Sequence, residues 1–263
     1  MTQDRDFETY DVLGVPMSAT TLDSASTAIV RWAGDDKARF VFIRDVHGIM
    51  QAKGDEELMR LHEKASMVTP DGMPLVWLGQ SAGQRVSRTC GPDLMEKVLL
   101  ESPRTGLKHY FYGGKPGVAE KLKTGFVARA PGLEVVGVDT PPFRALTPSE
   151  LENVAADINR SGADVVWIGV STPKQEYLMD KLAPHLSATL VGVGAAFDFH
   201  TGAVSRAPIW MQRTGLEWLW RLSSEPRRLW RRYLVLAPKF VLLIALEKFK
   251  NSGDPLQKNK PSA

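Results

Sequence analysis

The chain of 263 residues contains a single cysteine and no cluster of metal-ligating side chains. Cys90 alone cannot form an internal disulfide or a site built from several thiolates, and it fits a reducing cytoplasm. The five histidines show no spacing typical of metal ligands. The one Asp-x-Asp, at Asp4 and Asp6, precedes the first predicted strand. We therefore expect no bound metal and no other cofactor.

The sequence also lacks the signature motifs of several large enzyme classes. It contains no P-loop, no complete G-x-G-x-x-G and no G-x-S-x-G. These absences disfavour an ATPase, a dinucleotide-dependent enzyme and a serine hydrolase. The first residues, MTQDRDFETYD, are polar and acidic and do not form a secretory signal peptide. We therefore expect a cytoplasmic protein.

Short apolar runs alternate with amphipathic stretches over about the first 200 residues. The apolar runs predict strands at Phe40–Arg44, Ser66–Thr69, Leu107–Gly113, Leu133–Val138, Val165–Val170 and Thr189–Gly194. The stretches between them predict helices at Thr21–Ala33, Gly48–Lys64, Pro92–Glu101, Gly117–Arg129, Pro148–Asn159 and Pro173–Leu182. Alternation at this spacing predicts an α/β fold with a mainly parallel, Rossmann-like sheet and helices on both faces.

The alternation stops after Asp198, and the remaining sequence reads as consecutive helices without a strand. We expect an α/β catalytic core at residues 1–204 and an all-helical, basic and aromatic C-terminal appendage at residues 205–250. The polar remainder, residues 251–263, is expected to be a disordered tail.

Reactive side chains follow several predicted strands, where sheets of this kind bind their ligands. Asp71 lies in a Thr-Pro-Asp-Gly turn, and a carboxylate there could act as a general base toward a hydroxyl group. Such turns also favour aspartate for local reasons alone. Asp198 follows a glycine-rich strand end and could hold ribose hydroxyls, or it could cap a connecting loop.

Two further strand ends could bind phosphate. Gly113 and Gly114 would let the backbone approach a nucleotide closely, with Lys115 adding positive charge, although Gly-Gly turns are common. In GVSTPKQEYLM, Pro173 suits the first position of a helix with Thr172 as its N-cap, and helix N-termini attract anions. Thr172 and Gln175 also have the spacing of a capping box. Capping and ligand binding both remain open for this glutamine.

The predicted appendage is basic and rich in tryptophan. Residues 205–250 hold ten Lys or Arg against three acids, and four of the seven tryptophans. Arg221, Arg228 and Arg231 fall on one side of a helix if Pro226 starts a turn, and clustered guanidinium groups suit a pyrophosphate. The alternative is a solvated charged face.

An apolar run of about 14 residues, YLVLAPKFVLLIAL, follows these arginines. It is too short to span a bilayer, which takes roughly 20 residues. It suits a helix lying in an anionic membrane surface, and it has no use in nucleic-acid binding.

Five stretches occur together in order: TPDGMPLVW, YFYGGKPGVAEKL, GVSTPKQEYLM, GVGAAFDFHTGAVSRAPIWMQRTGLEWLWRL and EPRRLWRRY. They resemble the WecG/TagA/CpsF family of bacterial glycosyltransferases over about residues 40 to 235. The resemblance implies inverting, metal-independent transfer of a sugar from a UDP-sugar to a polyprenyl-diphosphate-linked saccharide. The sugar would be N-acetylmannosamine, its uronic acid or a hexose such as glucose. The pathway would be cell-surface polysaccharide or exopolysaccharide synthesis, at the inner face of the plasma membrane.

The resemblance also assigns residues. It implies that Asp71 is the catalytic base, that Gln175 lies near the donor, and that Arg221, Arg228 and Arg231 bind the diphosphate. The substrate-binding candidates are Ile43, Asp45, Thr69, Gly113, Gly114, Lys115, Gly169, Pro173, Lys174 and Asp198. Ile43 and Asp45 stand where many members have threonine and asparagine, which leaves the identity of the donor sugar open.

The expected partners are the UDP-sugar donor, the lipid-linked acceptor and an anionic membrane surface, with no nucleic acid. The oligomeric state stays open, a homo-oligomer included. Two alternatives to this reading are a non-catalytic, membrane-tethered module that binds a nucleotide sugar in an assembly complex, and a sugar-phosphate transferase.

Overall fold

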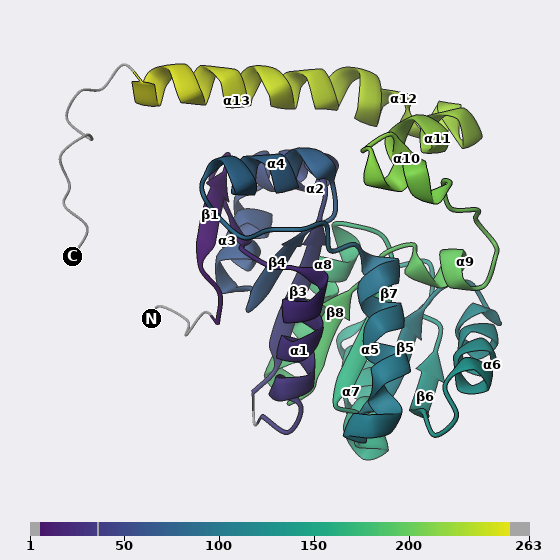
Figure 1. The fold of residues 1–263 in the computed structure, drawn as a ribbon. Helices are drawn as coiled ribbons and strands as arrows, with labels where there is room; N and C mark the ends of the chain where they lie inside the picture. Colours follow the sequence, from purple (N-terminus) through teal and green to yellow (C-terminus); the bar gives the residue numbers. More distant parts are fainter. Residues whose placement is uncertain (1–5, 36, 253–263) are drawn as a thin grey trace.

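The computed structural model describes residues 6–35 and 37–252, and its centre is a six-stranded parallel sheet (Figure 1). The strand order is β4-β3-β8-β7-β5-β6, and every neighbouring pair is parallel. The strands are β3 (Arg39–Arg44), β4 (Met67–Pro70), β5 (Lys108–Gly113), β6 (Glu134–Asp139), β7 (Val165–Gly169) and β8 (Thr189–Gly192). The predicted α/β fold with a mainly parallel sheet is confirmed.

Helices cover both faces of the sheet, and each face has its own apolar core. The helices on one face are α1 (Leu22–Trp32), α5 (Gly91–Thr105) and α6 (Val118–Arg129). Those on the other are α2 (Val46–Lys53), α3 (Glu56–Lys64), α7 (Pro148–Ser161) and α8 (Lys174–Leu182). The central strands are buried on both faces, which is why they read as continuous apolar runs in the sequence.

Three local features differ from the sequence-based predictions. An antiparallel hairpin, β1 (Thr9–Val12) and β2 (Val15–Ser18), precedes the first predicted helix. An additional helix, α4 (Met73–Ser81), follows Asp71. The single helix predicted over residues 48–64 is two helices, because Asp55 starts α3 by accepting a hydrogen bond from the Leu58 N–H (3.0 Å).

The predicted N-cap of α8 is wrong. Pro173 occupies that position and makes no side-chain capping bond, and the Gln175 N–H donates to the Ser171 carbonyl instead (3.1 Å). The Thr172 hydroxyl points inward and donates to a carboxylate oxygen of the fully buried Glu176 (3.2 Å). The capping-box interpretation of this stretch is therefore also wrong.

After β8 the described chain contains helices and loops but no strand, which confirms the all-helical C-terminal segment. The elements are α9 (Ala196–His200), α10 (Ile209–Arg213), α11 (Glu217–Ser224), α12 (Pro226–Trp230), the π-helix η2 (Arg231–Leu236) and α13 (Ala237–Ser252). The remainder of the predicted tail, residues 253–263, lies outside the described residues. Within the part of the chain that the structure describes, no helix is both long and apolar enough to cross a membrane.

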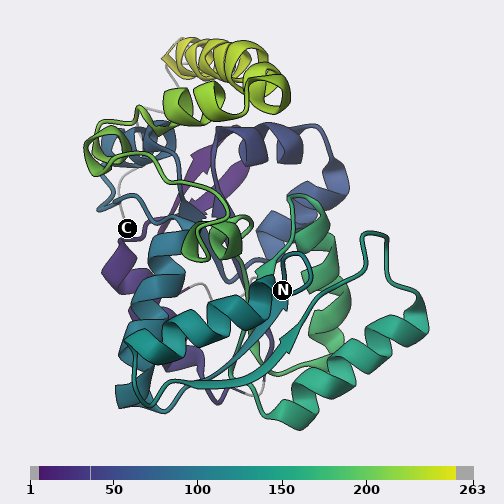
Figure 2. The ribbon, with the colours of Figure 1, turned by 90° about the vertical axis from the view of Figure 1, so that its right-hand side faces the viewer.

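The C-terminal helices α10 to α13 form a layer at one end of the α/β unit, above α2 and α4 (Figures 1 and 2). Helix α13 and η2 both contact α2, and Phe240 of α13 is buried in the core on that side. The layer therefore faces the loops that follow the carboxyl ends of β3 and β4.

Candidate active site

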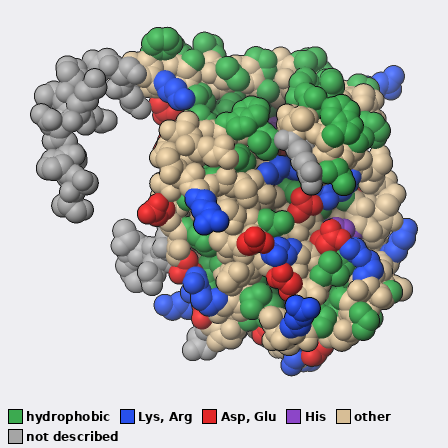
Figure 3. All heavy atoms as spheres, in the orientation of Figure 1, with side chains coloured by type: hydrophobic (Ala, Val, Ile, Leu, Met, Phe, Trp, Pro, Cys, Tyr) green, Lys and Arg blue, Asp and Glu red, His purple; other side chains and the backbone are tan. Residues whose placement is uncertain are grey.

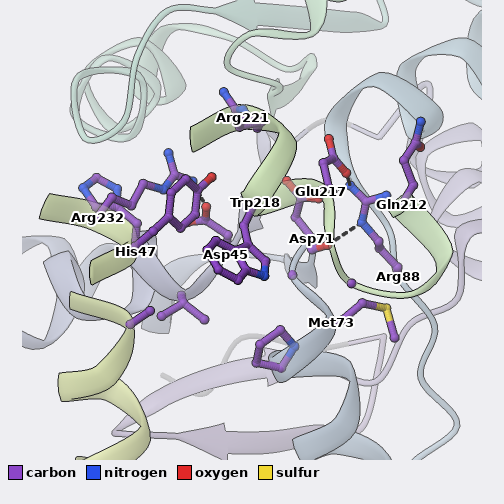
Figure 4. Close-up of a pocket in the computed structure, with 16 residues that line it drawn as sticks. Asp45, His47, Asp71, Met73, Arg88, Gln212, Glu217, Trp218, Arg221 and Arg232 are labelled. Carbon is purple, nitrogen blue, oxygen red and sulfur yellow. Dashed lines mark hydrogen bonds and ion pairs between the residues drawn. The ribbon is translucent and has the colours of Figure 1, made fainter. Parts of the chain in front are cut away.

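A cavity of about 240 Å³ lies between the C-terminal helices and the loops that follow β3 and β4. Figure 4 shows two groups of titratable side chains at its opposite ends, with Trp218 between them. One group is Asp71, Arg88 and Glu217, and the other is Asp45, His47 and Arg232.

Asp71 is placed by the turn that joins β4 to α4. Its backbone N–H donates to the Arg44 carbonyl (2.7 Å), so the turn is fastened to the end of the neighbouring strand β3. The side chain is 35% exposed and lines the cavity. The carboxylate therefore sits at the carboxyl edge of the sheet, where the sequence predicted a catalytic group.

Arg88 holds Asp71 from the segment between α4 and α5. Its Nε donates to the Asp71 carbonyl (2.7 Å), and its Nη2 donates both to Asp71 Oδ1 (3.0 Å) and to Glu217 Oε2 (2.6 Å). One guanidinium group thus bridges a carboxylate of the α/β unit and a carboxylate of α11.

The environment of Asp71 favours the protonated form more than water does. Burial raises the pKa of Asp71, and the charge of Glu217 raises it further. The charges of Arg88 and Arg221 act in the opposite direction but do not cancel the effect of burial. No described residue donates a hydrogen bond to Oδ2, which leaves this oxygen free to accept a proton. Such a carboxylate has the properties of a general base.

Asp45, at the other end of the cavity, begins α2 and binds the C-terminal layer. Its Oδ1 accepts from the Gly48 N–H (2.9 Å), and its Oδ2 forms an ion pair with Arg232. Beside it, burial and the charge of Arg44 lower the pKa of His47, so that the imidazole is neutral at neutral pH.

The C-terminal layer supplies cationic and aromatic groups to the cavity. Trp218 of α11 and Tyr233 of η2 lie with their ring centroids 5.8 Å apart. Arg221 also lines the cavity, with its guanidinium over the Phe199 ring (5.7 Å). Its buried Nε has no hydrogen-bond partner among the described residues. These groups are suited to binding an anion.

The other two predicted arginines lie elsewhere. Helix α11 ends before Glu225, so Arg228 and Arg231 do not share a continuous helix with Arg221. Arg228 is exposed and pairs with Glu225 (2.9 Å), and Arg231 is exposed with its guanidinium 5.8 Å from the centre of the Trp230 ring. Neither lines the cavity.

The predicted phosphate-binding glycines lie at the ends of β5 and β7, outside the cavity. The Gly114 N–H donates to the Gly169 carbonyl (3.0 Å), and a Cβ on Gly113 would lie 2.6 Å from the carbonyl group of Gly169. Packing alone thus requires glycine at residue 113. The helices after β5 and β7 leave on opposite faces of the sheet, which makes this a topological switch point. Lys115 and Lys174 are exposed beside it.

Gln175 is buried rather than facing the cavity, with 2% of its surface exposed. Its Oε1 accepts from the Gly194 N–H (3.1 Å), and its Nε2 donates to Glu176 Oε1 (2.9 Å). In this structure the glutamine fixes the loop that follows β8.

The remaining predicted site residues also lie outside the cavity. Thr69 is fully buried and donates to the Thr89 carbonyl (3.0 Å), and Ile43 packs against the core on the α1 side. Asp198 is half-buried in α9, and Pro173 precedes α8.

Several residues that line the cavity were missing from the sequence-based site. Those with polar side chains include His47, Arg88, Gln212, Glu217, Trp218, Arg232 and Tyr233. No motif marks Arg88 or Glu217, since the contact between them forms only when α11 docks on the α/β unit. Within the described residues, no group of three or more His, Cys, Asp or Glu could hold a metal ion.

A comparison with protein-family models bears on this cavity. The model described as "Glycosyl transferase WecG/TagA/CpsF family" matches residues 10–254. The match covers both the α/β unit and the C-terminal helices, and therefore both walls of the cavity.

Proposed function

Because the chain belongs to the WecG/TagA/CpsF family of glycosyltransferases, we propose that it transfers a sugar from a UDP-sugar to a polyprenyl-diphosphate-linked saccharide, with inversion at the anomeric carbon. Family membership itself implies a UDP-sugar donor and a lipid-linked acceptor in cell-envelope polysaccharide synthesis. The observation that carries the proposal is the carboxylate of Asp71 in a cavity covered by cationic and aromatic side chains.

The proposed reaction uses the free oxygen of Asp71. Oδ2 accepts the proton of an acceptor hydroxyl, whose oxygen attacks the anomeric carbon from the side opposite UDP. The bond between that carbon and the diphosphate oxygen breaks, and its electron pair leaves with UDP. A single displacement of this kind inverts the anomeric centre. The desolvation that raises the pKa of Asp71 makes the carboxylate a stronger proton acceptor.

We assign stabilisation of the departing diphosphate to guanidinium groups of the C-terminal layer. Arg221 supports this assignment through its buried, unpaired Nε, which could donate to a phosphate oxygen. Arg232 supports it because burial lowers the pKa of this guanidinium, and a bound diphosphate would offset that cost. Arg228 and Arg231 would bind the diphosphate as well only if α12 and the start of η2 moved toward the cavity. The reaction would then be metal-independent, and a chelator would leave its rate unchanged.

The nucleotide is proposed to lie along the carboxyl edge of the sheet, between the switch point and Asp71. The switch point offers backbone groups at Gly113, Gly114 and Gly169 and the exposed ammonium groups of Lys115 and Lys174. Asp198 would be the ribose-binding residue. In this proposal Gln175 acts by fixing the loop after β8, in addition to the donor contact expected from its sequence position.

We propose that the C-terminal layer also holds the enzyme at the inner face of the plasma membrane. Figure 3 shows hydrophobic side chains along the edge formed by these helices. The exposed apolar residues of this layer include Ile209, Trp210, Leu219, Leu234, Val241, Leu242, Leu246 and Phe249. Exposed cations such as Arg227 and Lys239 accompany them. Apolar and cationic groups together favour an anionic membrane surface.

The donor sugar is proposed to be N-acetylmannosamine, its uronic acid or a hexose such as glucose. Asp45 bears on this choice because its carboxylate is already paired with Arg232 and lines the cavity. A negatively charged sugar could compete for the same guanidinium group.

A donor screen tests the proposed function. The full chain would be incubated with UDP-sugars and a polyprenyl-diphosphate-linked acceptor, and UDP and UMP would be measured. Release of UDP with one donor is expected. Release of UMP would identify a sugar-phosphate transferase, and binding without turnover would identify a non-catalytic module.

A further inference from the structure

Glu217 is the residue of the C-terminal layer that binds Arg88, the arginine paired with Asp71. It is the first residue of α11, and the preceding Gly215 has a positive φ of 78° in the turn that aims this helix at the α/β unit. The side chain of Glu217 is 18% exposed, and its Oε2 lies 2.6 Å from Arg88 Nη2. The same nitrogen lies 3.0 Å from Asp71 Oδ1. The two carboxylates therefore share one nitrogen, which has an N–H group for each of them, and Glu217 has the shorter contact.

Sharing Arg88 in this way affects the proton affinity of Asp71. A guanidinium paired with Asp71 alone would stabilise the carboxylate form and weaken it as a base. A second carboxylate on the same guanidinium reduces that stabilisation and adds repulsion. In agreement with this geometry, the charge of Glu217 raises the pKa of Asp71, while the charge of Arg221 on the same helix lowers it.

The other groups around Asp71 do not duplicate this effect. The charged or titratable groups of the surrounding elements are Asp45 and His47 after β3, Cys90 and Asp93 at the start of α5, Arg206 before α10, Arg221 of α11, and Arg232 and Tyr233 of η2. Asp45 is paired with Arg232, and Asp93 is paired with Arg206 (2.6 Å). Burial keeps the Cys90 thiol protonated by raising its pKa. Glu217 is thus the acid that shares a donor with Asp71.

We propose that Glu217 is a positioning residue, which shares Arg88 with Asp71 and so makes Asp71 a strong proton acceptor only while α11 is docked on the α/β unit. The inference rests on the proposed function, because it assigns a regulator to the proposed base. The contact between Glu217 and Arg88 couples the proton transfer to the position of the C-terminal helices, whose outer side is proposed to meet the membrane. An enzyme with these helices displaced would keep Asp71 but with Arg88 paired to it alone, as a weaker base.

The test compares Glu217→Gln with two controls in the full chain. Glu217→Asp keeps the charge, and Glu225→Gln makes the same neutralisation on the C-terminal layer at a residue that pairs with Arg228 instead. The pH profile of kcat/KM is measured for each. The acidic limb, which reports the base, is expected at lower pH in Glu217→Gln, with a lower plateau rate. In both controls the acidic limb should lie at the same pH as in the wild type. An acidic limb that does not move in Glu217→Gln would overturn the inference.

A second measurement separates this inference from the proposed function. Aspartate labelled with ¹³C at Cγ gives a titration curve for Asp71, whose signal is identified by its loss in Asp71→Asn. The midpoint is expected at lower pH in Glu217→Gln than in the wild type. An unchanged midpoint contradicts the inference even if the enzyme transfers sugar. If the wild type releases no UDP, the proposed function fails, and this titration still decides the role of Glu217.

Discussion

Gly113 lies so close to Gly169 that the two strand ends leave no room for a side chain at residue 113. Its φ is 152°, and an added Cβ would lie 2.6 Å from the carbonyl carbon and oxygen of Gly169. Both contacts are with backbone, which cannot move aside as a flexible side chain can. The glycine that the sequence analysis connected with phosphate binding therefore has a packing role as well.

We expect Gly113→Ala to lower the free energy of unfolding by about 1–3 kcal/mol, through overpacking. The control is Gly125→Ala in α6, where an added Cβ meets nothing within 4 Å. There alanine should raise stability by up to about 1 kcal/mol through helix propensity. Urea denaturation measures both. If Gly113→Ala were as stable as the wild type, the close contact between residue 113 and the Gly169 backbone would be contradicted.

Arg221 and Arg228 differ in their placement although the sequence grouped them. Arg221→Met removes a guanidinium that lines the cavity, and we expect a loss of about 10²–10³ in kcat, as for other donors to a developing negative charge. Arg228→Met removes an exposed group paired with Glu225, and its loss should be smaller. Steady-state rates of UDP release measure both. Equal losses would mean that α12 closes over the substrate.

Among the helices and strands, a buried ion pair joins β3 to α8 beneath the candidate site. Arg44 Nη2 lies 2.7 Å from Glu176 Oε1, and both side chains are at most 1% exposed. Arg44 Nε also donates to His62 Nε2 (2.6 Å), and burial lowers the pKa of His62 to about 3, so this imidazole is neutral. The backbone carbonyl of Arg44 accepts from the Asp71 N–H. The pair thus fixes the strand end that holds the proposed base.

Glu176→Gln should lower the free energy of unfolding by about 3–5 kcal/mol, because it leaves the Arg44 guanidinium buried without a counter-ion. The matched control on the same helix is Asp180→Asn. Asp180 pairs with Lys64 at the surface (3.4 Å), and its loss should cost about 0–1 kcal/mol. Chemical denaturation compares the two variants. Similar stabilities would show that the buried pair carries no more weight than the surface pair.

The strands of the parallel sheet and the amphipathic helices could be predicted from sequence, whereas the β1–β2 hairpin and helix α4 could not. The central strands β7 and β8 coincide with apolar runs, since burial on both faces leaves few polar positions. The β1–β2 hairpin has strands of four residues, too short for a clear pattern. Helix α4, with the sequence MPLVWLGQS, is apolar on most sides and so shows no amphipathic period.

The site was predictable only in part. Asp71 was found because it follows a strand, Asp45 was assigned through the family resemblance and Arg221 through the arginine cluster, and all three line the cavity. Arg88, Glu217 and Arg232 acquire their roles from contacts between segments more than 100 residues apart, which no local pattern records. The family resemblance grouped Arg221, Arg228 and Arg231, but α11 ends between the first and the second.

In the molecule as a whole, the C-terminal layer faces the α/β unit on one side and presents apolar side chains on the other. Leu242, Leu246 and Phe249 of α13 are each more than half exposed. Apolar residues without a partner and basic neighbours are the two components of reversible membrane binding. The same layer carries Glu217 and Arg221 to the candidate site, so binding and catalysis would share one element.

We expect the triple variant Leu242→Glu, Leu246→Glu and Phe249→Glu to fold normally but to lose binding to vesicles that contain anionic lipid. Sedimentation with such vesicles measures this. Salt should weaken wild-type binding through screening of the basic groups. A matched variant with Val127→Glu and Leu100→Glu, exposed residues of α6 and α5, should bind as the wild type does. Equal binding by all three proteins would contradict a membrane-facing C-terminal layer.

The most direct measurement is the rate of sugar transfer by Asp71→Asn. The substitution keeps the size of the side chain but removes its negative charge and its ability to accept a proton. With the donor identified by the screen and a polyprenyl-diphosphate-linked acceptor, we expect kcat to fall by about 10²–10⁴ while the fold and UDP binding are retained. Asp180→Asn, the surface control, should turn over at the wild-type rate. Full activity of Asp71→Asn would show that the proton is accepted by another group, and would contradict the account.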